Sequence, residues 1–309
     1  MAILLTGAGG FLAKALIPRL LERGDKVYGL YHKPPRQHIP HRLLVLVGDI
    51  LKLGLGLENC PSDIDAIYHL AARLDLTNNK KVGEANVDGT RNVLSFMKSH
   101  DIPRLVFMST AYTQHRNGYE ISKEQAERDV LLASATQGLK VSIIKPSVII
   151  GSRENPGTDQ TINHVALTIV KVHRKAEAAR RKVQDTLALP PLELGFRVRG
   201  DPQATLNVIP VEVVADEIAK LKEKEGVFFI TNPNPPLLQE VADEIGDALG
   251  LNIQILKEFR ASPPEKLLEK LIKPFLPYMT GEPHFPTIVP RDFKLPQDHL
   301  RDMVSAFLS

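Results

Sequence analysis

The fold of this chain is decided by residues 2–13, which read AILLTGAGGFLA. An apolar run leads into Gly7, and Gly7, Gly10 and Ala13 hold the three small positions of a GxxGxxG-type pattern. Glycine lets the backbone turn tightly, and a helix that begins after such a turn offers unpaired N–H groups to an anion. A glycine-rich turn alone is weak evidence, because tight turns also use glycine for steric reasons. Between a strand and a helix it predicts a loop for the pyrophosphate of a dinucleotide, contacted by Gly7, Gly9, Gly10, Phe11 and Leu12.

Further apolar runs follow this loop, separated by segments with helical periodicity. The runs are KVYGLYH, RLLVLVGDI, AIYHLAA, RLVFMST and KVSIIKPSVIIG. The helical segments are Phe11–Arg23, Gly83–His100 and Tyr119–Gln137. Continuous rather than alternating apolar strands belong to a parallel sheet that is covered on both faces. Residues 1–150 are therefore predicted to form a doubly wound parallel α/β sheet, a Rossmann fold that binds NAD(P).

The second half of the chain, residues 151–309, is less regular. Proline-rich connections such as NPNPP and SPPEKLL separate a few helices and the apolar run GVFFI. This pattern predicts a smaller, mostly helical part that binds the substrate, with residues 208–232 returning to the sheet. Residues 161–183 have the spacing of a basic amphipathic helix. Three roles stay open for it: packing within its own domain, a lid over an anionic substrate, or a dimer contact.

Composition excludes several classes of protein. The chain has 309 residues, 43% hydrophobic and 24% charged, and its net charge of +3 lacks the basic excess of a nucleic-acid binder. Cys60 is the single cysteine, so no internal disulfide framework is expected, and the ten histidines show no metal-ligand spacing. We expect a cytoplasmic protein without a metal, a nucleic-acid partner or a membrane span, which acts on a small molecule, with a homodimer as one option.

The second apolar run ends in basic residues. It continues into YHKPPR (31–36), and no Asp or Glu occurs within residues 26–48, where an NAD-binding fold usually offers an acid to the ribose. His32, Lys33 and Arg36 would instead suit the 2′-phosphate of NADP(H), although a solvated basic turn would look the same. We therefore predict a preference for NADP(H), with NAD(H) as the alternative. Asp49 and Ile50, at the end of the third run, are expected to border the adenine.

Several short motifs occur in order along the first half. They are TGAGGFLA at the start, GDI after the third run, HLAA (69–72), NVDGT (86–90), ST (109–110) and YEISK (119–123). Together they resemble the extended short-chain dehydrogenase/reductases, the NAD-dependent epimerase/dehydratase-like proteins, over about the first 150 residues. Two features depart from that pattern: Ala13 replaces the last glycine, and only eight residues separate Thr110 from Tyr119.

The resemblance assigns chemical roles to the YEISK segment and to the strand before it. In such enzymes the tyrosine, here Tyr119, exchanges a proton with the substrate, and the lysine, here Lys123, binds the nicotinamide ribose and lowers the pKa of the tyrosine. The hydroxyl that holds the substrate oxygen falls on Thr110 or, because of the short link, on Ser109. A phenol with a pKa of about 10 is a poor base unless nearby positive charge stabilises phenolate. The resemblance also implies cofactor contacts from Leu70, Ala71, Ala72, Asn86, Pro146, Ser147 and Val148.

Differences within the family narrow the reaction. Sugar-nucleotide dehydratases carry an Asp-Glu pair after the threonine, whereas Ala111 and Tyr112 follow Thr110 here. Sugar-nucleotide enzymes also tend to have Asn in the segment after the sixth strand, where this chain has Val148. The phrases FMSTAY, NGYEISKEQAE, NVIPVEVVADEI and PYMTGEPHF are instead similar to the branch that includes fatty acyl-CoA reductases and thioester-reductase domains.

That branch implies an NADP(H)-dependent oxidoreductase that transfers hydride to the carbonyl of an acyl thioester, an aldehyde or a ketone. Tyr119 would supply the proton and Thr110 would hold the developing oxyanion. Residues 151–175 and 260–290 would build the substrate pocket, with Tyr112 as part of a wall. Two alternatives stay open. One is an NAD-dependent sugar-nucleotide epimerase, which recycles its cofactor, and the other is a non-catalytic NADP-binding protein, suggested by the short link before Tyr119.

Overall fold

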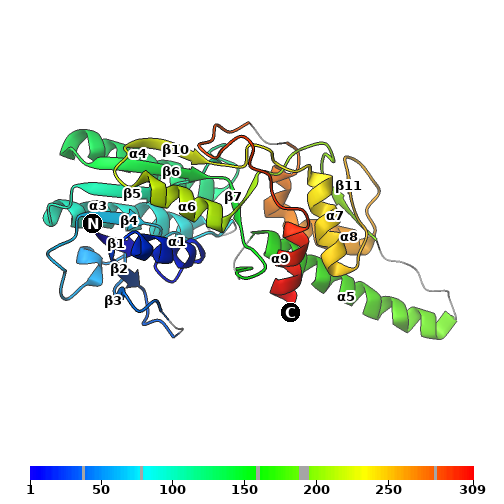
Figure 1. Ribbon diagram of the computed structural model, residues 1–309. Coiled ribbons are helices and arrows are strands. Elements are labelled where there is room, and N and C mark those ends of the chain that lie inside the picture. Colours follow the sequence, from blue (N-terminus) through cyan, green and yellow to red (C-terminus); the bar gives the residue numbers. More distant parts are fainter. Residues whose placement is uncertain (37–38, 77–78, 158–160, 188–194, 282–283) are drawn as a thin grey trace. The chain divides into compact units, whose positions relative to one another are not determined.

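A parallel sheet is the framework of the nucleotide-binding part of the chain (Figure 1). In the computed structural model, which describes residues 1–36, 39–76, 79–157, 161–187, 195–281 and 284–309, seven strands pair in the order β10-β6-β5-β4-β1-β2-β3. Every one of these pairings is parallel. The strands are β1 (Ala2–Thr6), β2 (Lys26–Tyr31), β3 (Leu43–Val47), β4 (Ala66–His69), β5 (Arg104–Met108), β6 (Lys140–Pro146) and β10 (Gly226–Ile230). The predicted doubly wound sheet is confirmed.

The chain changes its winding direction between β1 and β4. After β1 it moves outward to β2 and β3, and it then returns to add β4 on the other side of β1. In a sheet wound this way, ligands bind beyond the carboxyl ends of the strands, next to this switch point. Thr6 ends β1 and His69 ends β4, so the glycine loop and the HLAA segment meet at that place.

Helices cover both faces of this sheet. They are α1 (Phe11–Glu22), α2 (Asn79–Gly83), α3 (Gly89–Ser99), α4 (Gly118–Gln137) and α6 (Val211–Leu221), with the short 3-10 turn η1 (Leu53–Gly56) and the π-helical turn η2 (Glu84–Asp88). Right-handed crossovers that leave the switch point in opposite directions place α1 on one face, packed on α6, and α3 and α4 on the other. Side chains of α3, α4 and the strands form a buried apolar core on that second face.

Local sequence explains the ends of α4. Asn117 caps the N-terminus, since its side chain accepts the N–H of Glu120 at 3.0 Å, and Gly138 ends the helix with a φ of 69°. The continuous helix predicted over Gly83–His100 is wrong in one respect, because Glu84–Asp88 winds as a π-helix before α3 begins. Such a bulge often marks a functional site, and it carries the buried Asn86.

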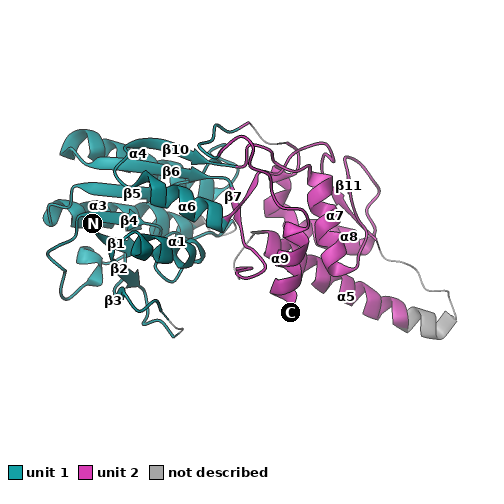
Figure 2. Ribbon diagram, in the orientation of Figure 1, with its two compact units in different colours: residues 1–147, 211–231, 285–289 teal, residues 148–210, 232–284, 290–309 magenta. Residues whose placement is uncertain are grey.

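A second compact unit contains residues 148–210, 232–284 and 290–309, while residues 1–147, 211–231 and 285–289 form the first (Figure 2). Its strands are β7 (Val148–Ile150), β8 (Phe196–Arg199), β9 (Val208–Pro210) and β11 (Ile253–Leu256), which pair in parallel as β7-β9 and β8-β11. Its helices are α5 (Thr161–Leu187), α7 (Leu238–Leu249), α8 (Pro263–Ile272) and α9 (His299–Leu308), with the 3-10 helix η3 (Lys273–Tyr278). Side chains of these four helices and of the strands share one apolar core.

The basic helix expected over residues 161–183 is α5. Ile162, Ile169 and Val172 are buried in the core of the second unit, whereas Ala179 is exposed. The apolar stripe therefore packs within its own unit over the first part of the helix. The side chain of Val183, and residues 282–283 of the phrase PYMTGEPHF, lie outside the described residues. None of the helices in the described ranges is long and apolar enough to span a bilayer.

Candidate active site

The glycine loop packs tightly against the segment that follows β4. Gly7 has a φ of +72°, and a Cβ built on it would lie only 2.8 Å from the backbone of Ala71. The N–H of Gly10 donates to the carbonyl of Gly7 at 2.8 Å, which closes the turn. A side chain at position 7 would therefore be strained and would clash with backbone that cannot move away. The sequence motif thus corresponds to a real close approach of two chain segments.

This loop fits the pyrophosphate of a dinucleotide. Gly10 is the N-cap of α1, and no acidic residue lies in the first turn, so the positive end of the helix meets no competing carboxylate. Gly9 and Gly10 are exposed, while Phe11 and Leu12 are half-buried and Ala13 is buried against the sheet. At the carboxyl end of β6, the buried Ser147 Oγ has no hydrogen-bond partner among the described residues, so a polar ligand atom could satisfy it.

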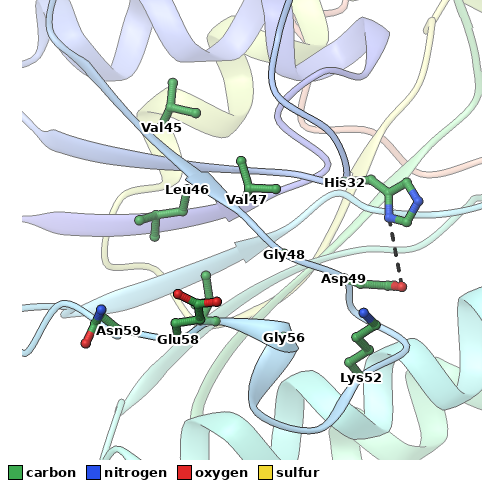
Figure 3. Close-up of a pocket in the computed structure, with 11 residues that line it drawn as sticks. His32, Val45, Leu46, Val47, Gly48, Asp49, Lys52, Gly56, Glu58 and Asn59 are labelled. Carbon is green, nitrogen blue, oxygen red and sulfur yellow. Dashed lines mark ion pairs between the residues drawn. The ribbon is translucent and has the colours of Figure 1, made fainter.

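The ends of β2 and β3 line a pocket of about 550 Å³ (Figure 3). Figure 3 shows His32, Asp49 and Lys52 at one end of it, with Glu58 and Asn59 at the other. The imidazole Nδ1 of His32 lies 3.9 Å from the Asp49 carboxylate. The pocket thus contains two of the predicted cofactor residues. Sequence reasoning missed Lys52, although it lies only three residues after Asp49.

The other predicted residues at this end lie around the pocket rather than in its lining. Lys33 and Arg36 are exposed on the chain that follows β2. Ile50 packs against α3, where a Cβ added to Gly89 would come within 2.7 Å of its Cδ1 atom. The ring of Tyr31, which sequence reasoning did not select, lies 3.5 Å from the position a Gly9 Cβ would take. The region at the ends of β2 and β3 is therefore open and carries several basic side chains, with an aromatic side chain beside the glycine loop.

A chain of hydrogen bonds joins the ends of β1 and β4 to α3. The Thr6 hydroxyl lies 2.7 Å from Nδ1 of His69, whose Nε2 lies 3.1 Å from the Thr90 hydroxyl. Thr90 donates to the carbonyl of Asn86 at 2.7 Å, so it accepts from His69, and the imidazole proton sits on Nε2. Burial, and then the charge of Lys123, lowers the pKa of His69 to about 3, which keeps the ring neutral. The HLAA histidine is thus a fixed structural connector.

Asn86 connects α4 to the segment after β4. Its Oδ1 accepts the N–H of Arg73 at 2.7 Å, and its Nδ2 donates to the Arg73 carbonyl at 3.1 Å and to Ser122 Oγ at 2.9 Å. Ser122 in turn donates to the carbonyl of Tyr119 at 2.8 Å. The side-chain amide of Asn86 is used within the protein, so it supports the site through Ser122, and Leu70, Ala71 and Ala72 lie in the segment that it holds.

Tyr119 and Lys123 lie one turn apart at the start of α4, as their spacing predicts. Tyr119 is half-buried, and Lys123 is buried with its ammonium 4.6 Å from the centroid of the Phe107 ring. Burial, and then the Glu120 carboxylate, raises the pKa of Tyr119 to about 12. Burial lowers the pKa of Lys123 to about 7, with Glu127 acting in the opposite direction. Desolvation is thus the largest cause of both shifts, and in each group it disfavours the charged form.

The two candidate hydroxyls differ in their partners. Ser109 Oγ is buried and donates to the Glu127 carboxylate at 2.7 Å. Thr110 Oγ1 accepts the N–H of Tyr112 at 3.2 Å, which leaves its own proton for another acceptor. Thr110 is therefore the hydroxyl better placed to contact a substrate oxygen. Pro146 and Ser147 are buried at the end of the first unit, and Val148 begins β7 of the second.

The short link between Thr110 and Tyr119 is held by its own side chains. Arg116 bonds the buried Glu120 at 3.0 Å, and its guanidinium lies 5.2 Å from the ring centroid of Tyr112. Tyr112 is buried and meets the ring of Phe285 edge-on at 5.1 Å. Phe285 belongs to the short segment 285–289 of the first unit, which bonds the residue after β10 through Thr287. Tyr112 thus forms part of an aromatic cluster next to Thr110.

A family model and a curated relative both match more than half of the chain. The model of the NAD dependent epimerase/dehydratase family matches residues 3–186. A 2-alkyl-3-oxoalkanoate reductase of Stenotrophomonas maltophilia is 30% identical over 274 residues, which cover 81% of this chain and 76% of the relative.

Two solved structures share the fold at low sequence identity. The terminal R domain of the myxalamid PKS-NRPS pathway is 21% identical with a TM-score of 0.70, over 99% of this chain and 89% of that domain. A UDP-glucose 4-epimerase of Thermus thermophilus, solved with NAD, is 19% identical with a TM-score of 0.67, over 100% of this chain and 99% of the epimerase. Both likenesses concern the fold alone.

Proposed function

Because the chain belongs to the NAD-dependent epimerase/dehydratase family, whose members are NAD(P)-dependent enzymes, we propose that it is a reductase that uses NADPH to reduce a carbonyl group. The extended short-chain dehydrogenase/reductase type is established by the family match, and it includes both reductases and epimerases. The direction of the reaction, the choice of NADPH and the class of substrate are the parts that we propose.

One observation carries the proposal: Tyr119 and Lys123 lie one turn apart at the start of α4, with Lys123 packed over Phe107 of β5, the strand that leads to Thr110. Burial raises the pKa of Tyr119 to about 12, so its phenol is protonated at neutral pH. Reduction of a carbonyl leaves negative charge on the oxygen, so it needs an acid rather than a base at that oxygen. A protonated Tyr119 therefore suits reduction better than oxidation.

Three side chains have separate roles in the proposed reduction of the carbonyl. NADPH, held by the glycine loop and by the ends of β2 and β3, would supply the hydride for the carbonyl carbon. Tyr119 Oη donates its proton to the carbonyl oxygen, while the Thr110 hydroxyl hydrogen-bonds the same oxygen and stabilises its developing charge. Lys123, with a pKa near 7, offers positive charge close to the phenol when it is protonated, which eases the loss of the tyrosine proton.

We assign the pocket at the ends of β2 and β3 to the adenosine of the cofactor and call it the adenosine end. Its side chains favour NADPH over NADH. His32 and Lys52 line the pocket, and the exposed Lys33 and Arg36 follow His32 along the chain. These side chains can surround a 2′-phosphate with positive charge, and residues 26–48 contain no acid to bond a free ribose hydroxyl. Asp49 lies near His32 and remains available to the adenine amino group.

The substrate is proposed to carry an apolar substituent beside its carbonyl. The cluster of Tyr112 and Phe285 places aromatic surface next to Thr110, which suits alkyl or aryl groups better than a sugar phosphate. The relative named 2-alkyl-3-oxoalkanoate reductase supports a ketone of this kind. Acyl thioesters and aldehydes are the next members of the class.

Oxidation of NADPH tests the proposal when it is followed with 3-oxo acids, simple ketones, aldehydes and acyl-CoA thioesters. We expect turnover with at least one apolar carbonyl, faster with NADPH than with NADH, and slower by about 10²- to 10⁴-fold with Tyr119→Phe. The contrary result is an enzyme that oxidises no NADPH with any carbonyl, retains NAD(H) through purification and isomerises a UDP-sugar. That result would identify an epimerase and refute the reductase.

A further inference from the structure

A largely buried ion pair joins α4 to β6 and is not used by the chemistry described so far. Lys145 Nζ lies 2.8 and 3.0 Å from the two carboxylate oxygens of Glu127. The side chain of Lys145 is 10% exposed and that of Glu127 is 14% exposed. Ser109 completes the cluster by donating its hydroxyl proton to Glu127 at 2.7 Å. Three charged or polar side chains are thus bonded to one another away from water.

Each member of this cluster is a close neighbour of a residue that the reaction needs. Ser109 immediately precedes Thr110 at the end of β5. Glu127 follows Lys123 by one turn on α4, and Lys145 lies two residues before Ser147 at the end of β6. The cluster therefore ties together the three elements that carry the hydroxyl, the Tyr/Lys pair and the strand end beside the cofactor site.

Stability alone is a weak reason for such a pair. Burying two charges costs desolvation energy that their attraction roughly repays, and apolar replacements of both partners are often neutral or stabilising. A pair kept under these conditions is better explained by the geometry that it fixes. Reacting groups need fixed positions, because small displacements in a site cost much of the rate.

We propose that Glu127 and Lys145 are positioning residues, which hold Thr110, the Tyr119/Lys123 turn of α4 and the end of β6 in their reactive arrangement. The inference rests on the proposed reductase function, since it assigns the pair a role in that reaction. Glu127 has a second effect through its charge, which opposes the lowering of the Lys123 pKa by burial. Loss of the pair would then disturb both the position and the charge of Lys123.

The test removes both charges at once. Glu127→Gln/Lys145→Met keeps the size of both side chains, leaves an acceptor for Ser109 and creates no unpaired buried charge, so we expect it to fold with a melting temperature close to that of the parent. We expect kcat for the carbonyl substrate to fall about 10- to 100-fold. The affinity for NADPH, measured by fluorescence titration, should fall less than kcat does, because Lys123 supplies only one of the proposed cofactor contacts. Lys145→Met alone, which leaves Glu127 unpaired, should lower the melting temperature as well.

The matched control is another ion pair on the same helix. Arg91 joins α3 to Asp129 of α4 at 2.7 Å and also lies 3.4 Å from Asp88, and neither Arg91 nor Asp129 has a role in the proposed reaction. Arg91→Met/Asp129→Asn should leave kcat at the parental value. A folded Glu127→Gln/Lys145→Met variant with parental kcat would overturn the positioning role, and so would an equal loss in the control.

A second readout keeps this test separate from the proposed function. If the parent oxidised NADPH with no carbonyl, the reductase proposal would fail, and amide hydrogen exchange would decide the positioning role. We expect faster exchange over residues 118–123 in Glu127→Gln/Lys145→Met than in the parent or the control. Equal exchange rates in the three proteins would refute the pair as a device that fixes this turn.

Discussion

The basic side chains that follow β2 and β3 are exposed, whereas the lysines beside the ends of β5 and β6 are buried. The side chain of His32 is 71% exposed, and its Nδ1 lies 3.9 Å from the Asp49 carboxylate. Lys123 and Lys145, by contrast, are almost fully enclosed, and each lies over an aromatic ring. The exposed end can select a ligand through charge at little cost to the fold. The buried end needs fixed geometry, and Tyr119 and Lys123 have shifted pKa values there because water is excluded.

The contrast predicts its largest effect at Tyr119. Tyr119→Phe removes the proton donor from the buried end but makes no change to the adenosine end, so we expect kcat to fall about 10²- to 10⁴-fold with unchanged NADPH affinity. Steady-state rates and fluorescence titration measure the two quantities. Tyr28→Phe is a matched control, because its hydroxyl bonds Asp63 outside the site. A Tyr119→Phe variant that kept more than about a tenth of the activity would break the mechanism.

The glycine loop lies between the two ends, and its tightness can be measured. Gly7→Ala must adopt a φ of +72° and also push its Cβ into the Ala71 backbone, so we expect a loss of about 2–4 kcal/mol in the free energy of unfolding, with weaker NADPH binding. Gly138→Ala also requires a positive φ, but its Cβ would have no atom within 4 Å. The free energy of unfolding should therefore fall by only about 1 kcal/mol. Equal losses in urea unfolding would show that the close approach is unimportant.

Substitutions at the exposed end should change the selectivity between NADPH and NADH rather than the stability of the fold. Lys33→Ala/Arg36→Ala removes two cations that we assign to the 2′-phosphate, so NADPH affinity should fall about 10-fold, or about 1.4 kcal/mol, while NADH affinity stays nearly constant. The melting temperature should not change, and Lys98→Ala on the exposed side of α3 controls for net charge. If the parent bound NADPH and NADH equally well, this end would not be a selector.

The smallest effect concerns the cost of burying Lys123. Its folded pKa of about 7 lies below the ordinary value of 10.5, so Lys123 opposes folding below pH 7, and that penalty disappears as the pH rises toward 10.5. Lys123→Met should therefore raise the free energy of unfolding at pH 7 by about 1 kcal/mol, with a smaller gain at pH 10. Urea unfolding at both pH values measures this, with Lys98→Met as an exposed control. A Met variant less stable than the parent at pH 7 would contradict it.

The sequence predicted which helix and strands carry the site residues better than it predicted the hydrogen-bond partners of their side chains. Tyr119 and Lys123 were expected on one helical face, and α4 places them there because its period follows from local spacing and from the Asn117 cap. The spacing left Ser109 and Thr110 as competing candidates for the hydroxyl. The structure adds one difference between them: Glu127, which lies 18 residues from Ser109, accepts the Ser109 proton.

What the sequence alone determined is therefore local: the tight turn at Gly7, the alternation of strand and helix, and the one-turn spacing of Tyr119 and Lys123. These follow from backbone conformation and side-chain periodicity, which need only near neighbours. The tertiary structure decided the neutral ring of His69 between two threonines, the π-helical turn at Asn86 and the buried pair of Glu127 and Lys145. Each depends on partners far along the chain and on the exclusion of water, which arise only when the sheet and its helices pack together.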